Sequence, residues 1–353
     1  MAVRRRDGIH IEVPAGGGDG ADGGGADGPG GAGRTFVADA SSAVGDVNVV
    51  SHAHADHTFS RTPETVVCSA ATAALVEART GKSVPAYREG TDEVTLYPSG
   101  HVVGSRAALV EVDGRDRADG ADRRYLYTGD FSVRDRLYLE GFDPVNADVL
   151  VMETTYGEPD YRFPAEDELQ AAIRDWLADA PDRPLFLFGY SLGRAQKLQR
   201  LASQATNRRL VVHDAVRTVN DAVESATDLS FPAETLAADG GDPLAGDEVV
   251  VLPTHLSRTD WVTDLVERHD GLKAGFSGWA VDESFRYRGG YDVTFPLTDH
   301  CDFDELVATV RAVDPEVVYT HHGFDEAFAD HLATRYGYDA RPLLGDQTRL
   351  DDF

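Results

Sequence analysis

Three histidines and one aspartate lie within the six residues from 52 to 57, in the segment SHAHADH. His52 and His54 are two residues apart, so they project the same way from an extended chain, whereas Asp56 and His57 begin a new turn. Imidazole and carboxylate are the ligands that zinc and similar divalent ions prefer. Because packing these groups together without a cation would be electrostatically unfavourable, the segment predicts a metal site.

Further polar residues each follow a short apolar run that reads as a strand. His101 stands in PSGHVVGS and Asp130 stands in YTGDFS. The adjacent pair His321 and His322 stands in VYTHHGF. Loops at strand ends are where a rigid scaffold aims ligands at one cleft. We therefore expect these residues to join the first cluster, with either His321 or His322 as the ligand.

The elements that must position these residues change in rhythm along the chain. In the first half, apolar runs such as 8–13 and 35–40 are separated by polar loops, which is typical of a meander of strands. From residue 185 onward, apolar runs alternate with amphipathic stretches, which favours a parallel α/β sheet covered on both faces. The segment 15–33 has 11 glycines in 19 positions and predicts a flexible loop between two strands.

The composition limits the class of protein. The chain has 353 residues and a net charge of −28, and only Lys82, Lys197 and Lys273 are lysines. Acidic excess with so little lysine is expected of a halophilic protein, and at ~1 M salt the Debye length is about 3 Å, so acidity does not exclude a polyanionic substrate. We expect a cytoplasmic protein, because no membrane span, secretory signal or disulfide framework is recognisable.

Four short motifs, taken in order, resemble the metallo-β-lactamase fold: HxHxDH at 52–57, GH at 100–101, TGD at 128–130 and HG at 322–323. Three further segments resemble the β-CASP branch of that family, which cuts nucleic acids: METTYG (152–157), FGYSLGRAQKL (188–198) and TDHCD (298–302). The compact length and GFSGWA (275–280) are most similar to the ligase-associated DNA exonucleases and archaeal mRNA 3′-end processing factors of that branch.

The resemblance implies an α/β fold, namely an αββα metallo-β-lactamase sandwich with an inserted β-CASP α/β domain. The sandwich would comprise residues 1–160 and 288–353, and the inserted domain would comprise residues 161–287. Because both pieces of the sandwich supply ligands, folding and metal binding would be coupled.

The resemblance also implies a role for each matching residue. The site would hold two Zn²⁺ ions, for which Mn²⁺ is a possible substitute. His322 is favoured over His321 because the family motif places its histidine directly before glycine. One ion would be bound by His52, His54 and His101, the other by Asp56, His57 and His322, with Asp130 between both; Asp39 would brace the site, and Asp56, Glu153 and His300 would be catalytic.

The implied activity is hydrolysis of phosphodiester bonds in single-stranded DNA or RNA, in DNA repair or RNA 3′-end processing. Paired metal ions supply a nucleophile at neutral pH and neutralise phosphate oxygens. A DNA ligase or RNA-processing proteins would be partners. The helix start at Ser191, with Arg194 and Lys197, would bind a phosphate, although simple capping by Ser191 is an equal alternative.

Two other functions compete with this interpretation. The GxSxG segment at 189–193 is also the pattern of a nucleophile elbow, so a serine hydrolase could use Ser191 with Asp260 or Asp299 and His321. That alternative explains one histidine, whereas the metal hypothesis explains the clusters. A non-catalytic β-CASP partner subunit is the other alternative, but no expected ligand position is empty. A small-molecule metallohydrolase would not need the segment 161–287.

Overall fold

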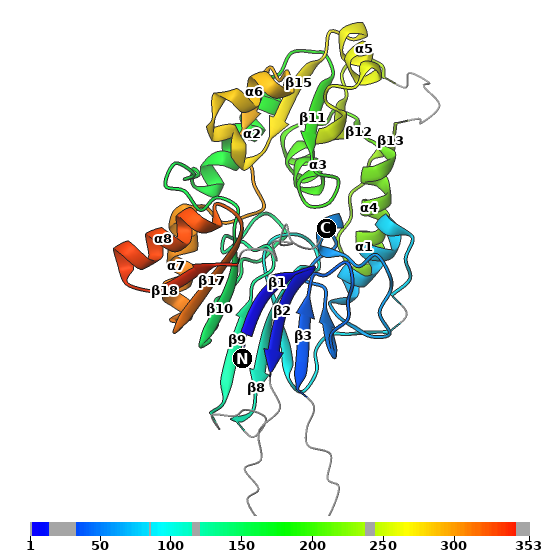
Figure 1. Cartoon of the computed structure of the whole chain (residues 1–353). Helices are drawn as coiled ribbons and strands as arrows, with labels where there is room; N and C mark the ends of the chain where they lie inside the picture. The colour runs from blue at the N-terminus through cyan, green and yellow to red at the C-terminus, as the bar shows by residue number, and fades with distance from the viewer. Residues whose placement is uncertain (1, 14–32, 85, 115–120, 237–243, 344–353) are drawn as a thin grey trace, which may run out of the picture.

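The structure of the protein is a computed structural model, and its described residues form three six-stranded sheets with helices packed on them (Figure 1). The structure describes residues 2–13, 33–84, 86–114, 121–236 and 244–343. The glycine-rich loop predicted at 15–33 lies, except for its last residue, outside the described residues. Within these ranges, no helix is both long enough and apolar enough to cross a membrane.

The first sheet contains the N-terminal strands in the order β1-β2-β3-β4-β5-β6. β1 to β3 pair antiparallel and β3 to β6 pair parallel. In this sheet the meander expected from the sequence therefore ends at β3. Beyond β3, the connections, which include a helix, bring the chain back to the same end of the sheet, so each following strand pairs parallel with the one before it. The strands are β1 (Ala2–Arg6), β2 (Gly8–Val13), β3 (Arg34–Ala38), β4 (Val47–Val49), β5 (Val66–Val67) and β6 (Tyr87–Arg88).

The second sheet has the order β18-β17-β10-β9-β8-β7 and joins strands from both ends of the chain. β7 to β9 pair antiparallel, whereas β9, β10, β17 and β18 all run parallel. The strands are β7 (Val94–Pro98), β8 (Arg106–Val112), β9 (Arg123–Tyr127), β10 (Val149–Thr154), β17 (Val317–Gly323) and β18 (Asp339–Pro342).

These two sheets pack face to face with helices outside them. Ile11 and Phe36 of the first sheet meet Val110 and Val151 of the second in one buried cluster. Helix α1 (Ala70–Thr80) packs outside the first sheet, and α7 (Phe303–Val313) and α8 (Asp325–Tyr336) pack outside the second. The αββα sandwich predicted from the sequence is confirmed.

The third sheet is parallel throughout and has the order β13-β12-β14-β11-β15-β16. Its central strands are completely buried, because helices cover both faces. The strands are β11 (Leu185–Gly189), β12 (Leu210–Val212), β13 (Glu234–Thr235), β14 (Val249–Pro253), β15 (Leu272–Phe276) and β16 (Val293–Phe295). The helices are α2 (Glu166–Asp179), α3 (Arg194–Ala205), α4 (Asp214–Ala226), α5 (Asp260–Arg268) and α6 (Glu283–Gly289).

The limits of the inserted domain remain a proposal. A boundary at residue 287 would separate β16 from its partner β15, since Ala274 pairs with Val293. We propose that the inserted unit extends to the end of β16, near Leu297, and that the sandwich resumes with the segment before α7.

The carboxyl ends of parallel strands position the site. β9, β10 and β17 run the same way, so their carboxyl ends meet at one edge of the second sheet. The carboxyl ends of β11 and β14 in the third sheet face the same space, because residues that follow them line a pocket together with His54 and His322. Ligand sites of open parallel sheets lie outside these ends.

Candidate metal centre

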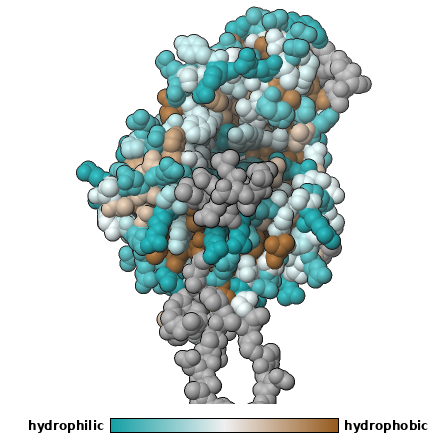
Figure 2. Space-filling view, viewed as in Figure 1, coloured by the Kyte–Doolittle hydropathy of each residue, from teal (hydrophilic) through white to brown (hydrophobic). Residues whose placement is uncertain are grey.

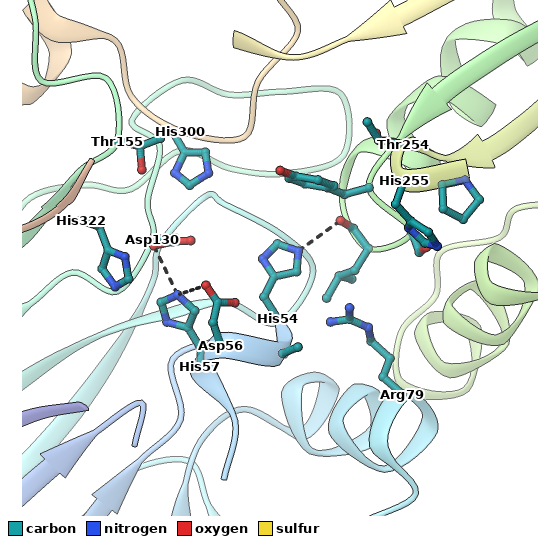
Figure 3. A pocket seen from close by; sticks show the side chains of 15 residues that line it. His54, Asp56, His57, Arg79, Asp130, Thr155, Thr254, His255, His300 and His322 are labelled. Carbon is teal, nitrogen blue, oxygen red and sulfur yellow. Dashed lines mark hydrogen bonds and ion pairs between the residues drawn. The ribbon is translucent and has the colours of Figure 1, made fainter. Parts of the chain in front are cut away.

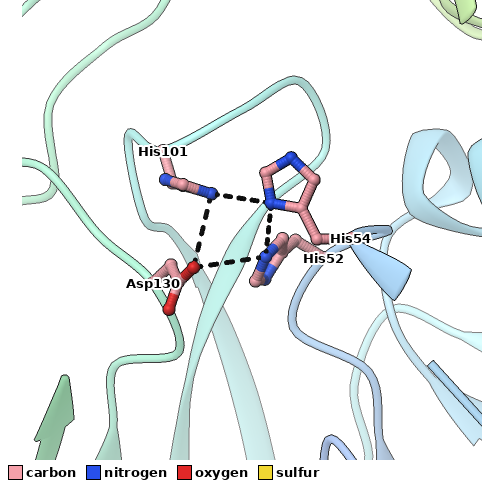
Figure 4. A group of neighbouring side chains, drawn as sticks. All are labelled: His52, His54, His101 and Asp130. Carbon is pink, nitrogen blue, oxygen red and sulfur yellow. Dashed lines mark hydrogen bonds and ion pairs between the residues drawn. The ribbon is translucent and has the colours of Figure 1, made fainter. Parts of the chain in front are cut away.

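Four polar side chains from three loops meet at the edge of the sandwich (Figure 4). Nε2 of His52 lies 3.0 Å from Nδ1 of His54, and Nε2 of His101 lies 3.2 Å from the same atom. Oδ2 of Asp130 lies 3.5 Å from Nε2 of His52 and 3.6 Å from Nε2 of His101. One ligand atom from each residue thus lies within 4.8 Å of the others, as a tetrahedral metal site requires.

A second group of the expected ligands lies on the other side of Asp130 (Figure 3). Nε2 of His57 lies 3.7 Å from Oδ1 of Asp130 and 3.7 Å from Oδ2 of Asp56. The rings of His57 and His322 are stacked with their centroids 5.7 Å apart. The two oxygens of Asp130 therefore face different groups of side chains, which supports its proposed place between two ions.

A β-bulge separates the roles of the two adjacent histidines. Glu153 of β10 pairs with His321 and Thr154 pairs with Gly323, so His322 is the extra residue of β17. Its φ of 61° is in the left-handed region, which turns its side chain out of the sheet pattern. His321 is fully buried and stacks on Tyr127, whereas His322 lines the pocket. The geometry supports His322 as the ligand, as the resemblance implies.

Asp39 holds the histidines from behind. Its Oδ2 accepts hydrogen bonds from Nδ1 of His57 at 2.8 Å, from the Tyr127 hydroxyl at 2.7 Å and from Oγ of Ser51 at 2.5 Å. Its Oδ1 accepts a further hydrogen bond from the backbone N–H of Ser51 at 2.7 Å. Since Asp39 is buried and already saturated with donors, the structure favours a bracing role, which fixes Nε2 of His57 toward the site.

The charge balance of the site suits cations. Burial and the neighbouring imidazoles hold the pKa of His52 and of His101 well below its usual value. These rings are therefore neutral, which is the metal-binding form. Although burial acts in the opposite sense, the carboxylates of Asp130 and Asp39 raise the pKa of His57 to about 10. The carboxylates thus favour positive charge at His57, and a metal ion there would have to displace a proton.

Glu153 and His300 form a buried pair next to these ligands. Nδ1 of His300 donates to Oε1 of Glu153 at 3.0 Å, and the backbone N–H of Thr155 donates to Oε2 at 2.7 Å. Although burial acts in the opposite sense, Glu153 raises the pKa of His300. The ring of His300 lies 4.6 Å from that of His101, centroid to centroid. Glu153 thus favours the protonated form of the imidazole that faces the site, which suits a proton donor.

The prediction that Arg194 and Lys197 bind phosphate requires correction. Nζ of Lys197 lies 2.6 Å from Oδ1 of Asp299, and Nη2 of Arg194 lies 3.1 Å from Oδ2. Both cations are buried with 3% or less of their surface exposed. They neutralise Asp299 and cannot reach a substrate without breaking this cluster. Of the three residues predicted to bind phosphate, Ser191, Arg194 and Lys197, only Ser191 lines the pocket that contains the expected ligands.

The serine-hydrolase alternative finds no assembled triad around Ser191. The carboxylate of Asp299 is held by Lys197 and Arg194, and Asp260 begins helix α5. Within the described ranges, neither ring nitrogen of His321 has a hydrogen-bond partner. Among the residues that the structure describes, the expected relay of hydrogen bonds from Asp260 or Asp299 through His321 to Ser191 is therefore not formed.

Sequence reasoning missed the wall of the pocket that faces the ligands (Figure 3). The pocket has a volume of about 400 Å³ and is lined on this side by Arg79, Tyr190, Thr254 and His255. Arg79, in the last turn of α1, donates to the carbonyl of Ala53 and also faces this space. Arg79, Thr254 and His255 stand in no motif, and the motif that contains Tyr190 gives no sign that its ring lines the pocket, so only the meeting of the third sheet with the sandwich reveals this wall.

Comparisons with known proteins find relatives that are named for work on nucleic acids. Over 317 residues, 86% of its length, the chain is 33% identical to an Opitutus terrae protein named "Probable DNA ligase". It is 33% identical over 112 residues, 30% of its length, to cleavage and polyadenylation specificity factor subunit 3 of Dictyostelium discoideum. It spans only 29% and 13% of these two relatives. The probable RNase MJ4 of Methanocaldococcus jannaschii is 23% identical over 72% of this chain and 68% of its own length.

A solved structure shows the same fold. A protein of unknown function from Enterococcus faecalis V583 superposes with a TM-score of 0.51 over 78% of this chain and 74% of its own, at 14% identity. No family model matches the chain.

Proposed function

Because this chain belongs to the β-CASP family of metallo-β-lactamase-fold nucleases, we propose that it hydrolyses phosphodiester bonds of nucleic acid with two bound divalent metal ions. The observation that supports this most directly is the set of four donor atoms, from His52, His54, His101 and Asp130, within 4.8 Å of one another. Bound zinc or manganese ions supply Lewis acidity toward phosphate oxygens and toward water.

The chain's own residues have distinct tasks in this proposal. His52, His54, His101 and Asp130 would hold one ion, and Asp130, Asp56, His57 and His322 would hold the other. His300 is positioned to give a proton to the leaving oxygen, and Glu153 keeps that proton on the ring. Asp56 has a side chain that is 71% exposed, so it can accept a hydrogen bond from an attacking water.

The substrate proposal follows from the pocket and the relatives. The pocket lies between the sandwich and the third sheet, and Arg79 brings positive charge to it. The long match to a relative named for DNA ligation supports DNA as the substrate and a DNA ligase as the partner. RNA is the second candidate, because a relative matched over most of its length is named a probable RNase.

The test uses single-stranded DNA and RNA, each labelled at one end, with the purified chain and either zinc or manganese. We expect a ladder of shortened products that a chelator abolishes and added metal restores. Ser191→Ala should leave the ladder unchanged, because this hydroxyl takes no part in metal-dependent hydrolysis. Cleavage that survives the chelator and disappears in Ser191→Ala would instead support a serine hydrolase.

A further inference from the structure

We infer that the strand being cut continues from the metal centre into a second pocket, where aromatic rings and two arginines hold one unpaired nucleotide. This pocket has a volume of about 590 Å³, within the ~300–1,000 Å³ that is typical of small-ligand sites. It lies between α6 and the segment after β14. Its lining includes Tyr161, Trp279, Phe285, Tyr291, Arg258 and Arg288. The inference rests on the proposed function.

Thr254 connects the two pockets. This residue follows β14 and lines both the metal pocket and the second pocket. A strand that passes from one pocket to the other would therefore run along this residue.

The aromatic rings that line the second pocket are tightly packed, and their contacts extend to His300, which is paired with Glu153. Trp279 packs against Tyr156 and Tyr161 with ring centroids 5.0 and 5.1 Å away. Tyr156 in turn meets the ring of His300 at 6.0 Å. Gly278 allows the Tyr156 ring to lie against the backbone next to Trp279, since a Cβ at residue 278 would come within 2.4 Å of that ring. Trp279 thus presents a fixed, partly exposed face close to the reaction site, on which a base can stack.

The two arginines give the pocket a positive end. Nη1 of Arg258 donates to the backbone carbonyl of Arg288 at 3.4 Å, and both residues line the pocket. No carboxylate of the described residues lies within ion-pair distance of either guanidinium, and both are exposed. Asp282 is near Arg288, but its carboxylate caps α6 by accepting from the backbone N–H of Ser284 at 2.7 Å.

A nucleotide is the occupant that this combination of groups fits. Arginine binds phosphate and aromatic faces bind bases, and neither contact depends on sequence. Inside a duplex both faces of a base pair are covered by the neighbouring pairs, so the site favours an unpaired strand. The continuity with a phosphodiester-cutting centre through Thr254 argues against an unrelated small ligand.

The test compares Arg258→Gln/Arg288→Gln with Arg311→Gln/Arg335→Gln. The control pair removes the same charge from exposed positions of α7 and α8 that line neither pocket. Each protein is assayed on labelled oligothymidylate and oligouridylate, and on bis(4-nitrophenyl) phosphate, which is too short to reach the second pocket. Binding of the labelled strands is also measured by fluorescence anisotropy with a chelator present.

We expect the test pair to lower kcat/KM for the strand at least about tenfold relative to that for bis(4-nitrophenyl) phosphate, and to weaken metal-free strand binding similarly. The control pair should change neither. Trp279→Leu should show the same selective loss, and Trp279→Phe should restore most of it.

Equal losses on both substrates, or identical behaviour of the two arginine pairs, would overturn the inference. A wild-type protein that cuts neither strand nor bis(4-nitrophenyl) phosphate would refute the proposed function itself, which is a distinguishable result.

Discussion

Replacing Asp130 by asparagine should lower kcat for strand cleavage by at least about a thousandfold while the protein stays folded. Oδ2 of Asp130 faces His52 and His101 at 3.5 and 3.6 Å, and Oδ1 faces His57 at 3.7 Å. Asparagine keeps the volume but offers one oxygen and no charge, so it cannot serve both groups of ligands. Steady-state cleavage and thermal unfolding by circular dichroism provide the measurement.

Asp330→Asn is the matched control for this change. Asp330 is an exposed residue of α8 that lines neither pocket, so its amide should leave kcat unchanged. If Asp130→Asn retained turnover within about tenfold of the wild type, a site organised around this carboxylate would be refuted.

Replacing Asp299 by asparagine should lower the free energy of unfolding by about 3–5 kcal/mol, because two buried cations lose their counter-charge. Lys197 and Arg194 are almost wholly buried, at 0% and 3% exposure, and both contact this carboxylate. Although burial acts in the opposite sense, the two cations hold the pKa of Asp299 well below its usual value. The carboxylate is therefore ionised throughout the neutral range.

The same substitution should weaken metal binding. The backbone carbonyl of Asp299 accepts a hydrogen bond at 2.9 Å from Nδ1 of His101, which leaves Nε2 of that ring facing the other ligands. If the substitution lets the loop that carries Asp299 move, this hydrogen bond to His101 would be lost and His300, the next residue, would be displaced. Urea unfolding measures the stability, and a zinc titration against a chelating dye measures the affinity, which we expect to fall about tenfold or more.

Glu248→Gln separates the two effects. Glu248 is fully buried in the third sheet unit, where it accepts from Arg209 at 2.6 Å and from the backbone N–H of Ala245 at 2.6 Å. Its loss should lower stability without changing zinc affinity, since it lies in neither pocket lining. Equal zinc affinity in wild type and Asp299→Asn would show that the Asp299 cluster does not position the ligands.

Local patterns predicted the strands, the parallel α/β sheet and a cluster of strand-end histidines, whereas the αββα sandwich was predicted from the family resemblance. The structure brings these histidines together. The bulge that turns His322 outward depends on how β17 pairs with β10, which no local pattern encodes. The boundary that we propose near Leu297 differs from the one expected at residue 287 for the same reason, because β16 shows its sheet only by pairing with β15.

Charged residues were the hardest to interpret from the sequence. Arg194 and Lys197 follow a turn that resembles an anion site, yet their partner Asp299 lies about a hundred residues later and all three are buried. Burial and long-range pairing are tertiary properties, so the sequence could not distinguish a phosphate contact from a structural ion cluster. Arg79 was missed because nothing near it in the sequence suggests an anion site. It faces the pocket only because of where α1 lies in the fold.

The metal content of the purified chain tests the central claim most directly. After dialysis against metal-free buffer and reloading with zinc, elemental analysis should find two ions per chain in the wild type and fewer in Asp130→Asn. A well-folded wild-type protein that retains no stoichiometric metal would contradict the assignment of these histidines and carboxylates to a metal centre.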